Sequence, residues 1–265
     1  MQTTISNSIS DVITEQLSIN MIEVEGDSFM MGYNVARERP IHEVNIPDFC
    51  IGQYLVTNEH FLPFLNEVGN QDEGGRKWVN IAGKFENVRC GIEEASNGFK
   101  CIEGLEKHPM IYVSWDGATA YCQWLSEKTG KEYRLPSESE WEYAAKGGKY
   151  SKGYTYSGSN NLKEVGWYDQ NSHGETKEVG LKKANELGLF DMSGNVFEWC
   201  ADHWHSNYEG TPDDGSPWNS NKDENTRVIR GGSWDNYDFF CRVSYRSGDV
   251  RNIRDYSIGF RIARY

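Results

Sequence analysis

Apolar and polar positions follow clear periods only in the first 145 residues of the chain. Met21 to Gly26 alternates apolar and charged residues, which predicts a strand with one buried face. A second short strand is expected from Phe49 to Val56. Residues 1–20 are polar, so they are interpreted as a linker or a loose helix.

Apolar residues recur at helical spacing in the segment that follows Thr57. Thr57 can cap the start of this first helix, and Gly69 can close it. Pro63 lies inside the segment, so we expect a kink or a later start. After the helix, residues 70–107 are rich in Gly, Asn and charge and are interpreted as an excursion from the core.

Two further helices have stronger end signals. Ser114 is a suitable N-cap and Gly130 a suitable stop for a helix with a buried stripe, formed by Ala118, Tyr121, Cys122 and Leu125. Ser137 and Glu140 have the spacing of a capping box, which predicts a short helix through Trp141 and Ala145.

From Gly147 onward, Gly, Asn, Asp, Ser and aromatic residues dominate, and few elements are expected. Val228 to Arg230 and Ile258 to Ala263 are predicted as strands. No internal repeat and no linker between two domains is visible, so residues 21–265 are interpreted as a single domain.

The charge balance argues against nucleic acid as a partner. The formal net charge is −13, which repels a polyanion unless a local basic face exists. Arginines after Thr226 offer such a face, but acidic and aromatic residues are interleaved with them. No apolar run is long enough to span a bilayer, and residues 1–20 lack the pattern of a signal peptide, so a soluble chain is expected.

The six cysteines show no CxxC pair, which argues against a structural zinc site. Cys90 and Cys101 bracket a short polar insert. Two interpretations stay open for this pair: a disulfide in an exported protein, or two separate thiols.

Six motifs occur in order along the chain, and together they carry a family resemblance. They are residues 21–32, 108–115 (HPMIYVSW), 134–145 (RLPSESEWEYAA), 188–199 (GLFDMSGNVFEW), 230–234 (RGGSW) and 258–261 (IGFR). The chain from about residue 21 resembles the formylglycine-generating-enzyme (sulfatase-modifying factor) family. This resemblance implies an α+β fold of the C-type-lectin-like kind: two helices, small antiparallel sheets and many loops, with the chain ends close together.

The same resemblance bears on catalysis. Enzymes of this family use two cysteines five positions apart after the Gly-Gly-Ser-aromatic motif, which bind copper and attack a substrate thiol. Here the second position is Cys241, but the first is Asn236. A single thiol cannot form the paired copper site, so we expect no catalytic residue and no enzyme, and Cys241 is interpreted as a buried framework thiol.

The stretch from Arg230 to Arg261 resembles the variable region of proteins diversified by retroelements. In that group adenine-directed mutagenesis scrambles Asn codons between a constant GGSW and a constant IGFR, which can never produce Lys, Glu, Gln, Met or Trp. None of these five types occurs among the 23 residues from Asp235 to Ser257. They fill roughly a quarter of the preceding chain, so about six would be expected and chance absence is on the order of one in a thousand.

Sixteen residues of this stretch are therefore the candidate ligand-binding positions, here called the outward set. Aromatic members supply rigid contact area and small polar members supply adaptable hydrogen bonds, as in antibody loops. The set is Asp235, Asn236, Tyr237, Asp238, Phe239, Phe240, Tyr245, Ser247, Gly248, Asp249, Val250, Asn252, Ile253, Asp255, Tyr256 and Ser257.

Five residues between them are expected to be framework, here called the frame residues: Cys241, Arg242, Val243, Ser244 and Arg246. The alternative interpretation is that the aromatics of the whole stretch are ordinary core residues of a Gly-rich fold.

Asn195 and Glu198 are the candidate metal residues. Family members bind calcium at the corresponding motif through oxygen ligands, which suit that ion. The alternative is that Asn195 fixes a turn and that Glu198 pairs with an arginine. No cofactor is required in either case.

The function expected from these observations is recognition: a display protein whose variable region about 230–261 binds a protein or a glycan-bearing macromolecule on another cell or surface. Export and display at the cell surface are expected, with membrane attachment only through a lipid anchor that is not in this chain. The alternatives are a formylglycine-generating-type oxidase acting on a peptide cysteine, and a lectin-like accessory domain with an ordinary surface.

Overall fold

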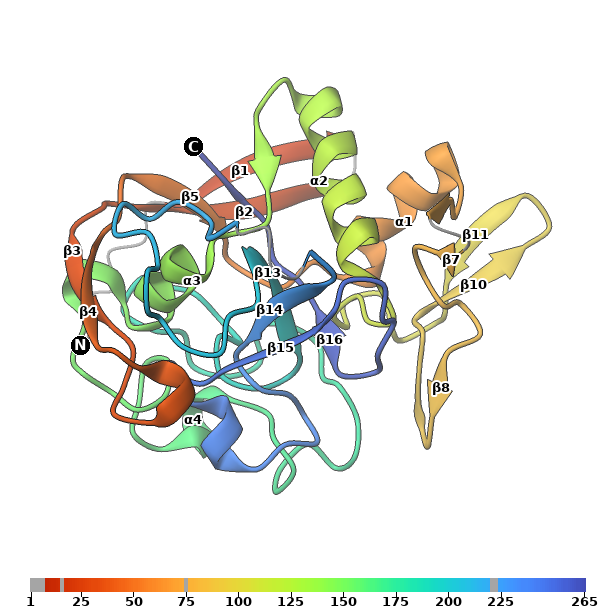
Figure 1. Cartoon of the computed structure of the whole chain (residues 1–265). Coiled ribbons are helices and arrows are strands. Elements are labelled where there is room, and N and C mark those ends of the chain that lie inside the picture. Colours follow the sequence, from red (N-terminus) through yellow and green to blue (C-terminus); the bar gives the residue numbers. More distant parts are fainter. Residues whose placement is uncertain (1–7, 15–16, 74–75, 220–223) are drawn as a thin grey trace.

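The computed structural model describes residues 8–14, 17–73, 76–219 and 224–265. Helices α1 (Asn58–Val68), α2 (Trp115–Thr129), α3 (Glu138–Ala145) and α4 (Leu162–Val165) occur among small sheets and long loops. None of the helices in these ranges is long and apolar enough to cross a membrane. The arrangement is the α+β fold expected from the sequence (Figure 1).

A five-stranded sheet joins both ends of the described chain. Its strand order is β1-β2-β5-β17-β12. The strands are β1 (Ser8–Thr14), β2 (Leu17–Val24), β5 (Phe49–Gly52), β17 (Ala263–Arg264) and β12 (Tyr133–Arg134). Because β17 pairs with β5, which in turn pairs with β2, the first and last strands lie in one sheet, as the family resemblance implied.

The expected linker over residues 1–20 is wrong where the structure describes it. Residues 8–14 and 17–24 form an antiparallel hairpin. Asp11 is buried there, and its carboxylate accepts hydrogen bonds from Lys131, Tyr133 and Arg264. The hydrogen bonds of Asp11 hold this strand in place, and a pattern of apolar residues cannot reveal them. Residues 1–7 and 15–16 lie outside the described residues.

The three predicted helices, α1, α2 and α3, begin and end where the sequence predicted, whereas α4 was not predicted. Thr57 accepts from the backbone N–H of His60, Ser114 accepts from that of Gly117, and Ser137 forms a complete capping box with Glu140. Pro63 lies inside α1, which nonetheless starts directly after Thr57. The later start that was one of the two expected effects of Pro63 is therefore wrong.

A four-stranded sheet lies at the centre of the molecule, in the order β15-β14-β13-β16 (Figure 1). The strands are β13 (Phe197–His203), β14 (Thr226–Arg230), β15 (Arg246–Val250) and β16 (Ile258–Gly259). β13 and β15 were not predicted. β13 is almost wholly buried and so has no alternation, while β15 is an edge strand whose residues are mostly half-buried.

Short hairpins make up the rest of the described strands. They are β3 (Ser28–Met31) with β4 (His42–Asn45), β6 (Asp72–Glu73) with β7 (Arg76–Lys77), β8 (Lys84–Phe85) with β9 (Val88–Arg89), and β10 (Ile92–Ala95) with β11 (Gly98–Cys101). The last three pairs belong to the predicted excursion, which extends to one side of the molecule (Figure 1).

Candidate functional site

The candidate stretch crosses four kinds of local structure. It leaves β14 through the RGGSW turn, forms the short 3-10 helix η3 (Asp238–Cys241), returns as β15, and reaches β16 through a loop. Gly232 has a φ of 73°, and an added Cβ would lie 2.7 Å from the Cys241 sulfur. Glycine therefore lets the turn approach η3 closely.

The structure separates the outward set from the frame residues. Every member of the outward set is exposed or half-buried, with Tyr237 67% and Phe239 48% exposed. All five frame residues are buried. The alternative in which the aromatics of the stretch form an ordinary core is wrong for Tyr237 and Phe239, whereas Tyr245, Ile253 and Tyr256 pack partly against the main core.

Buried ion pairs hold the frame in place. Arg246 binds Glu138 of α3 with two hydrogen bonds of 2.7 and 2.6 Å. Arg242 binds Glu38 in the same bidentate manner, at 2.7 and 3.1 Å. Bidentate pairs restrict both position and orientation, so they fix the stretch against elements distant in sequence.

Arg230 reaches the frame from β14. Its Nη1 donates to the carbonyl of Ser244 at 2.9 Å, and its Nη2 donates to that of Val243 at 3.1 Å. Nη2 also pairs with Glu142 of α3. One fully buried guanidinium therefore ties the backbone of the stretch to the third helix.

The pKa of Glu142 is lowered by the charged groups around it. Burial alone would raise the pKa of the Glu142 carboxyl, but Lys146, Arg230 and the backbone N–H of Gly32 outweigh it and lower that pKa to about 2. Lys146 lies 2.7 Å from Glu142. The carboxylate stays ionised at neutral pH and keeps Arg230 paired.

Four of the five outward aromatics gather in two patches. In the first, Phe239, Phe240 and Tyr245 pack edge to face with centroid distances between 5.1 and 5.8 Å. The Arg242 guanidinium lies 4.2 Å above the Phe239 ring. Their mutual packing presents the rings in restricted orientations, which lowers the entropy lost on binding.

The second patch contains residues that the sequence did not reveal. Phe85 of the β8–β9 hairpin stacks on Tyr256 with a centroid distance of 4.0 Å and an angle of 8°. Arg76 of β7 donates to the side chain of Asn252 at 3.2 Å. The excursion therefore borders the candidate surface, and no local signal in residues 70–107 indicates this contact.

Several polar members of the outward set also stabilise turns. Asp255 accepts from the backbone N–H of Ser257 at 2.8 Å. The Ser233 hydroxyl donates to Asp235 at 2.6 Å and lies 3.0 Å from the side-chain oxygen of Asn236. These residues shape the loops that carry the aromatics.

Cys241 is a buried framework thiol, as predicted. It packs with Leu162, Val165 and Tyr168, and this cluster holds no second cysteine among the described residues. Burial, together with the charge of Asp238, raises the pKa of the thiol well above its ordinary value. A protonated, enclosed thiol is a poor nucleophile and a poor metal ligand.

Asn195 and Glu198 bind other residues of the chain, as expected if Asn195 fixes a turn and Glu198 pairs with an arginine. The Asn195 amide exchanges two hydrogen bonds with the backbone of Lys177, and its φ of 63° places it in a turn. Glu198 binds Arg261 with two hydrogen bonds, and Trp141 donates to it at 2.9 Å. No cluster of three acidic, His or Cys side chains suited to a metal occurs in the described ranges. Calcium binding stays a prediction.

The two cysteines of the excursion are free thiols. Cys90 is buried and Cys101 half-buried, and burial raises the pKa of each to about 11. The structure therefore has Cys90 and Cys101 as two separate thiols and not as a disulfide.

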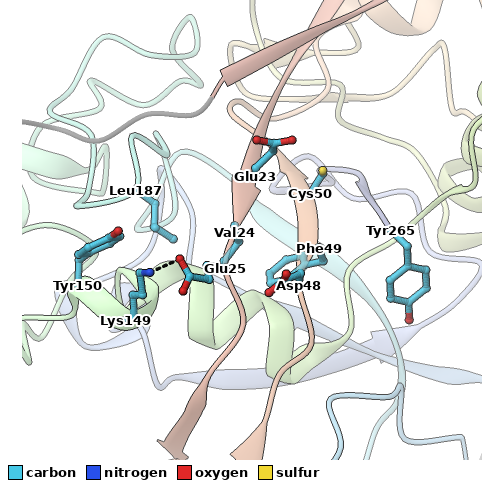
Figure 2. A pocket seen from close by; sticks show the side chains of 10 residues that line it. All are labelled: Glu23, Val24, Glu25, Asp48, Phe49, Cys50, Lys149, Tyr150, Leu187 and Tyr265. Carbon is cyan, nitrogen blue, oxygen red and sulfur yellow. Dashed lines mark hydrogen bonds and ion pairs between the residues drawn. The ribbon is translucent and has the colours of Figure 1, made fainter.

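A cavity of about 460 Å³ lies away from the outward set, between β2, β5 and the short 3-10 helix η2 (Gly148–Tyr150). Figure 2 shows the acidic side chains of Glu23, Glu25 and Asp48 there, with Lys149 paired to Glu25. No residue of the candidate stretch lines it.

The fold and the frame define a C-type-lectin-like α+β protein of the formylglycine-generating-enzyme type. The model of the sulfatase-modifying factor enzyme 1-like domain matches residues 11–265. The chain therefore belongs to this family.

Relatives in the family differ in activity. The chain is 30% identical to the formylglycine-generating enzyme of Streptomyces coelicolor, with 90% of this chain and 85% of that protein aligned. It is also 30% identical to the inactive Cα-formylglycine-generating enzyme 2 of Bos taurus, with 93% and 88% aligned. Family membership alone does not decide catalysis.

Another relative is much longer than this chain. The serine/threonine-protein kinase Pkn1 of Chlamydia trachomatis is 32% identical over 96% of this chain, but the alignment covers only 39% of the kinase.

Two solved structures share the fold over nearly the whole chain. PvdO from Pseudomonas aeruginosa aligns with a TM-score of 0.78 and 30% identity, covering 97% of both chains. Treponema denticola variable protein 1 aligns with a TM-score of 0.76 and 26% identity, covering 97% of this chain and 99% of that one.

Proposed function

We propose that this protein is a ligand-recognition module whose outward set forms a diversified binding surface. The observation that carries the proposal is the separation within residues 235–257: the positions expected to vary face outward, and the frame residues between them are buried. Substitution of outward residues then leaves the core intact, which is the condition for trying many sequences on one scaffold.

The chemistry of the surface suits macromolecular recognition. Two aromatic patches, one around Phe239 and one around Tyr256, supply large rigid contacts. The polar loops between them supply hydrogen bonds. The similarity to Treponema denticola variable protein 1 supports the same assignment.

The proposed partner is a protein or glycan-bearing macromolecule on another cell or surface. Nucleic acid is disfavoured because the net charge of −13 repels it. We further propose export and display at the cell surface, with a lipid anchor as the only membrane attachment. No cofactor is required for this role.

An oxidase function is disfavoured by the geometry around Cys241. Copper chemistry of the enzymatic branch needs two thiolates, whereas position 236 is Asn and the Cys241 thiol is enclosed by Tyr168 and its neighbours. Stoichiometric copper(I) binding that is lost in Cys241→Ser would restore the enzyme hypothesis.

Sequencing of the neighbouring DNA and of several strains tests diversification. We expect a near-copy of the codons for residues 230–261 that differs mainly at adenines, beside a reverse transcriptase gene. Variation among strains should fall on the outward set and spare the frame residues. Absence of the near-copy of the codons, or variation spread evenly over the outward set and the frame residues, would favour the alternative of a lectin-like accessory domain.

A binding experiment tests the surface itself. Once a ligand has been selected from a protein or glycan array, Phe239→Ala should weaken binding at least about tenfold. Leu181→Ala is the matched control, because Leu181 is 59% exposed and lies outside the stretch. Equal affinity of the two variants would count against the proposed surface.

A further inference from the structure

A second pocket lies along one side of α2, apart from the outward set. Its volume is about 540 Å³, and its walls come from α2, β12 and the β13–β14 region. Trp115 and Thr119 stand one helical turn apart on α2, and Leu135 and Ala201 add apolar wall. None of its lining residues belongs to the outward set.

Arg227 of β14 is the unusual member of this lining. Only 6% of the residue is exposed, and its guanidinium lies 4.3 Å above the Trp115 ring. Within the described part of the chain, neither Nε nor Nη1 of Arg227 has a hydrogen-bond partner. The Thr119 hydroxyl, which lines the same pocket, is likewise buried and unpaired among the described residues.

Other buried arginines of this protein are paired. Arg230, Arg246 and Arg261 each bind a carboxylate of Glu142, Glu138 or Glu198. A buried guanidinium without an anion costs free energy, so proteins rarely retain one without a use.

Nearby carboxylates are already engaged. Asp116 pairs with Arg251. Asp202 accepts hydrogen bonds from the backbone N–H groups of Glu138 and Trp218, at 2.6 and 2.8 Å. Neither carboxylate forms an ion pair with Arg227, so no carboxylate of the described residues occupies the guanidinium, which can bind a ligand.

We propose that this pocket binds a small monocarboxylic acid with an apolar or aromatic body. The carboxylate accepts from Nε of Arg227 and from the Thr119 hydroxyl, and the body lies against Trp115, Leu135 and Ala201. This geometry satisfies two buried donors that have no partner among the described residues.

The far end of the pocket restricts the ligand to one negative charge. Glu127 and Glu132 line that end, and Glu127 lies eight residues beyond Thr119, about 12 Å along the helix. Arg134 also lines the pocket, but it holds Glu140 with two hydrogen bonds of 2.7 Å. A second anionic group on the ligand would meet acidic side chains there.

Calorimetric titration of the full chain with 4-phenylbutyrate and its neutral analogue 4-phenylbutyramide tests this assignment. The carboxylate should bind at least about tenfold more tightly than the amide. Arg227→Met should abolish this preference, and Arg89→Met, at an exposed arginine, should retain it. Equal binding of acid and amide, or no binding of either at 10 mM, would overturn the proposal.

The stability of the variant separates a ligand site from a structural role. Arg227→Met should keep or raise the thermal midpoint of the ligand-free protein, because it removes a buried charge that no described carboxylate pairs. A lower midpoint means that Arg227 is structural and overturns the proposal. If Arg227→Met does not fold, Thr119→Val should weaken phenylbutyrate binding about threefold, and unchanged affinity would contradict the site.

Discussion

Neighbouring residues of the candidate stretch lie in opposite environments, some buried and some exposed. Arg230, Arg242 and Arg246 are buried and bind carboxylates of distant elements, whereas Tyr237 and Phe239 face outward. The frame derives its order from charge pairs whose partners lie on α3 and near residue 38. The outward residues take part in none of these ion pairs, so the difference shows how one segment can be rigid in backbone and free in side chain.

Removal of Arg230, which holds the frame residues from β14, should have the largest effect. Arg230→Met leaves Glu142 without its arginine and frees the carbonyls of residues 243–244. We expect the free energy of unfolding to fall by about 3–5 kcal/mol. Urea unfolding followed by tryptophan fluorescence measures this. Arg89→Met, at an exposed ion pair, is the control and should change stability by under about 1 kcal/mol.

Acid should weaken the same frame. The pKa of Glu142 is about 2 in the folded protein against an ordinary value of 4.5, so its contribution is present above pH 4.5 and is lost as pH falls toward 2. The full contribution is on the order of 3 kcal/mol. Unfolding free energy measured from pH 6 to 2.5 should fall less steeply for Glu142→Gln than for the parent; identical slopes would contradict the assignment.

Substitution on the outward side should have a small effect on folding. Tyr237→Ala and Phe239→Ala remove rings that are 67% and 48% exposed. Each should change the free energy of unfolding by at most about 1 kcal/mol. A loss of 3 kcal/mol or more for either variant in the same urea experiment would show that the fold needs these rings.

Calcium should have the smallest effect. Asn195 and Glu198 already bind Lys177, Arg261 and Trp141. Calcium would have to displace the Arg261 pair, so millimolar Ca²⁺ or a chelator should leave the thermal midpoint unchanged. A rise of several degrees with Ca²⁺ would instead support the calcium site.

Local signals were enough for α1, α2 and α3 and for the character of the candidate stretch, whereas α4 was not predicted. Caps at Thr57, Ser114 and Ser137 are decided by adjacent residues, and the structure has them all. The hairpin of residues 8–24 was missed because its anchor, Asp11, depends on Lys131 and Arg264.

The sequence by itself determined the family, the α+β fold and which residues of the stretch alternate between frame and surface, because these follow from ordered motifs and residue types. Only the tertiary structure decided which carboxylate holds each arginine, that Phe85 contacts Tyr256, and that Arg227 is buried with no ion-pair partner among the described residues. These contacts join segments tens to hundreds of residues apart, and no local period encodes a distance between such segments.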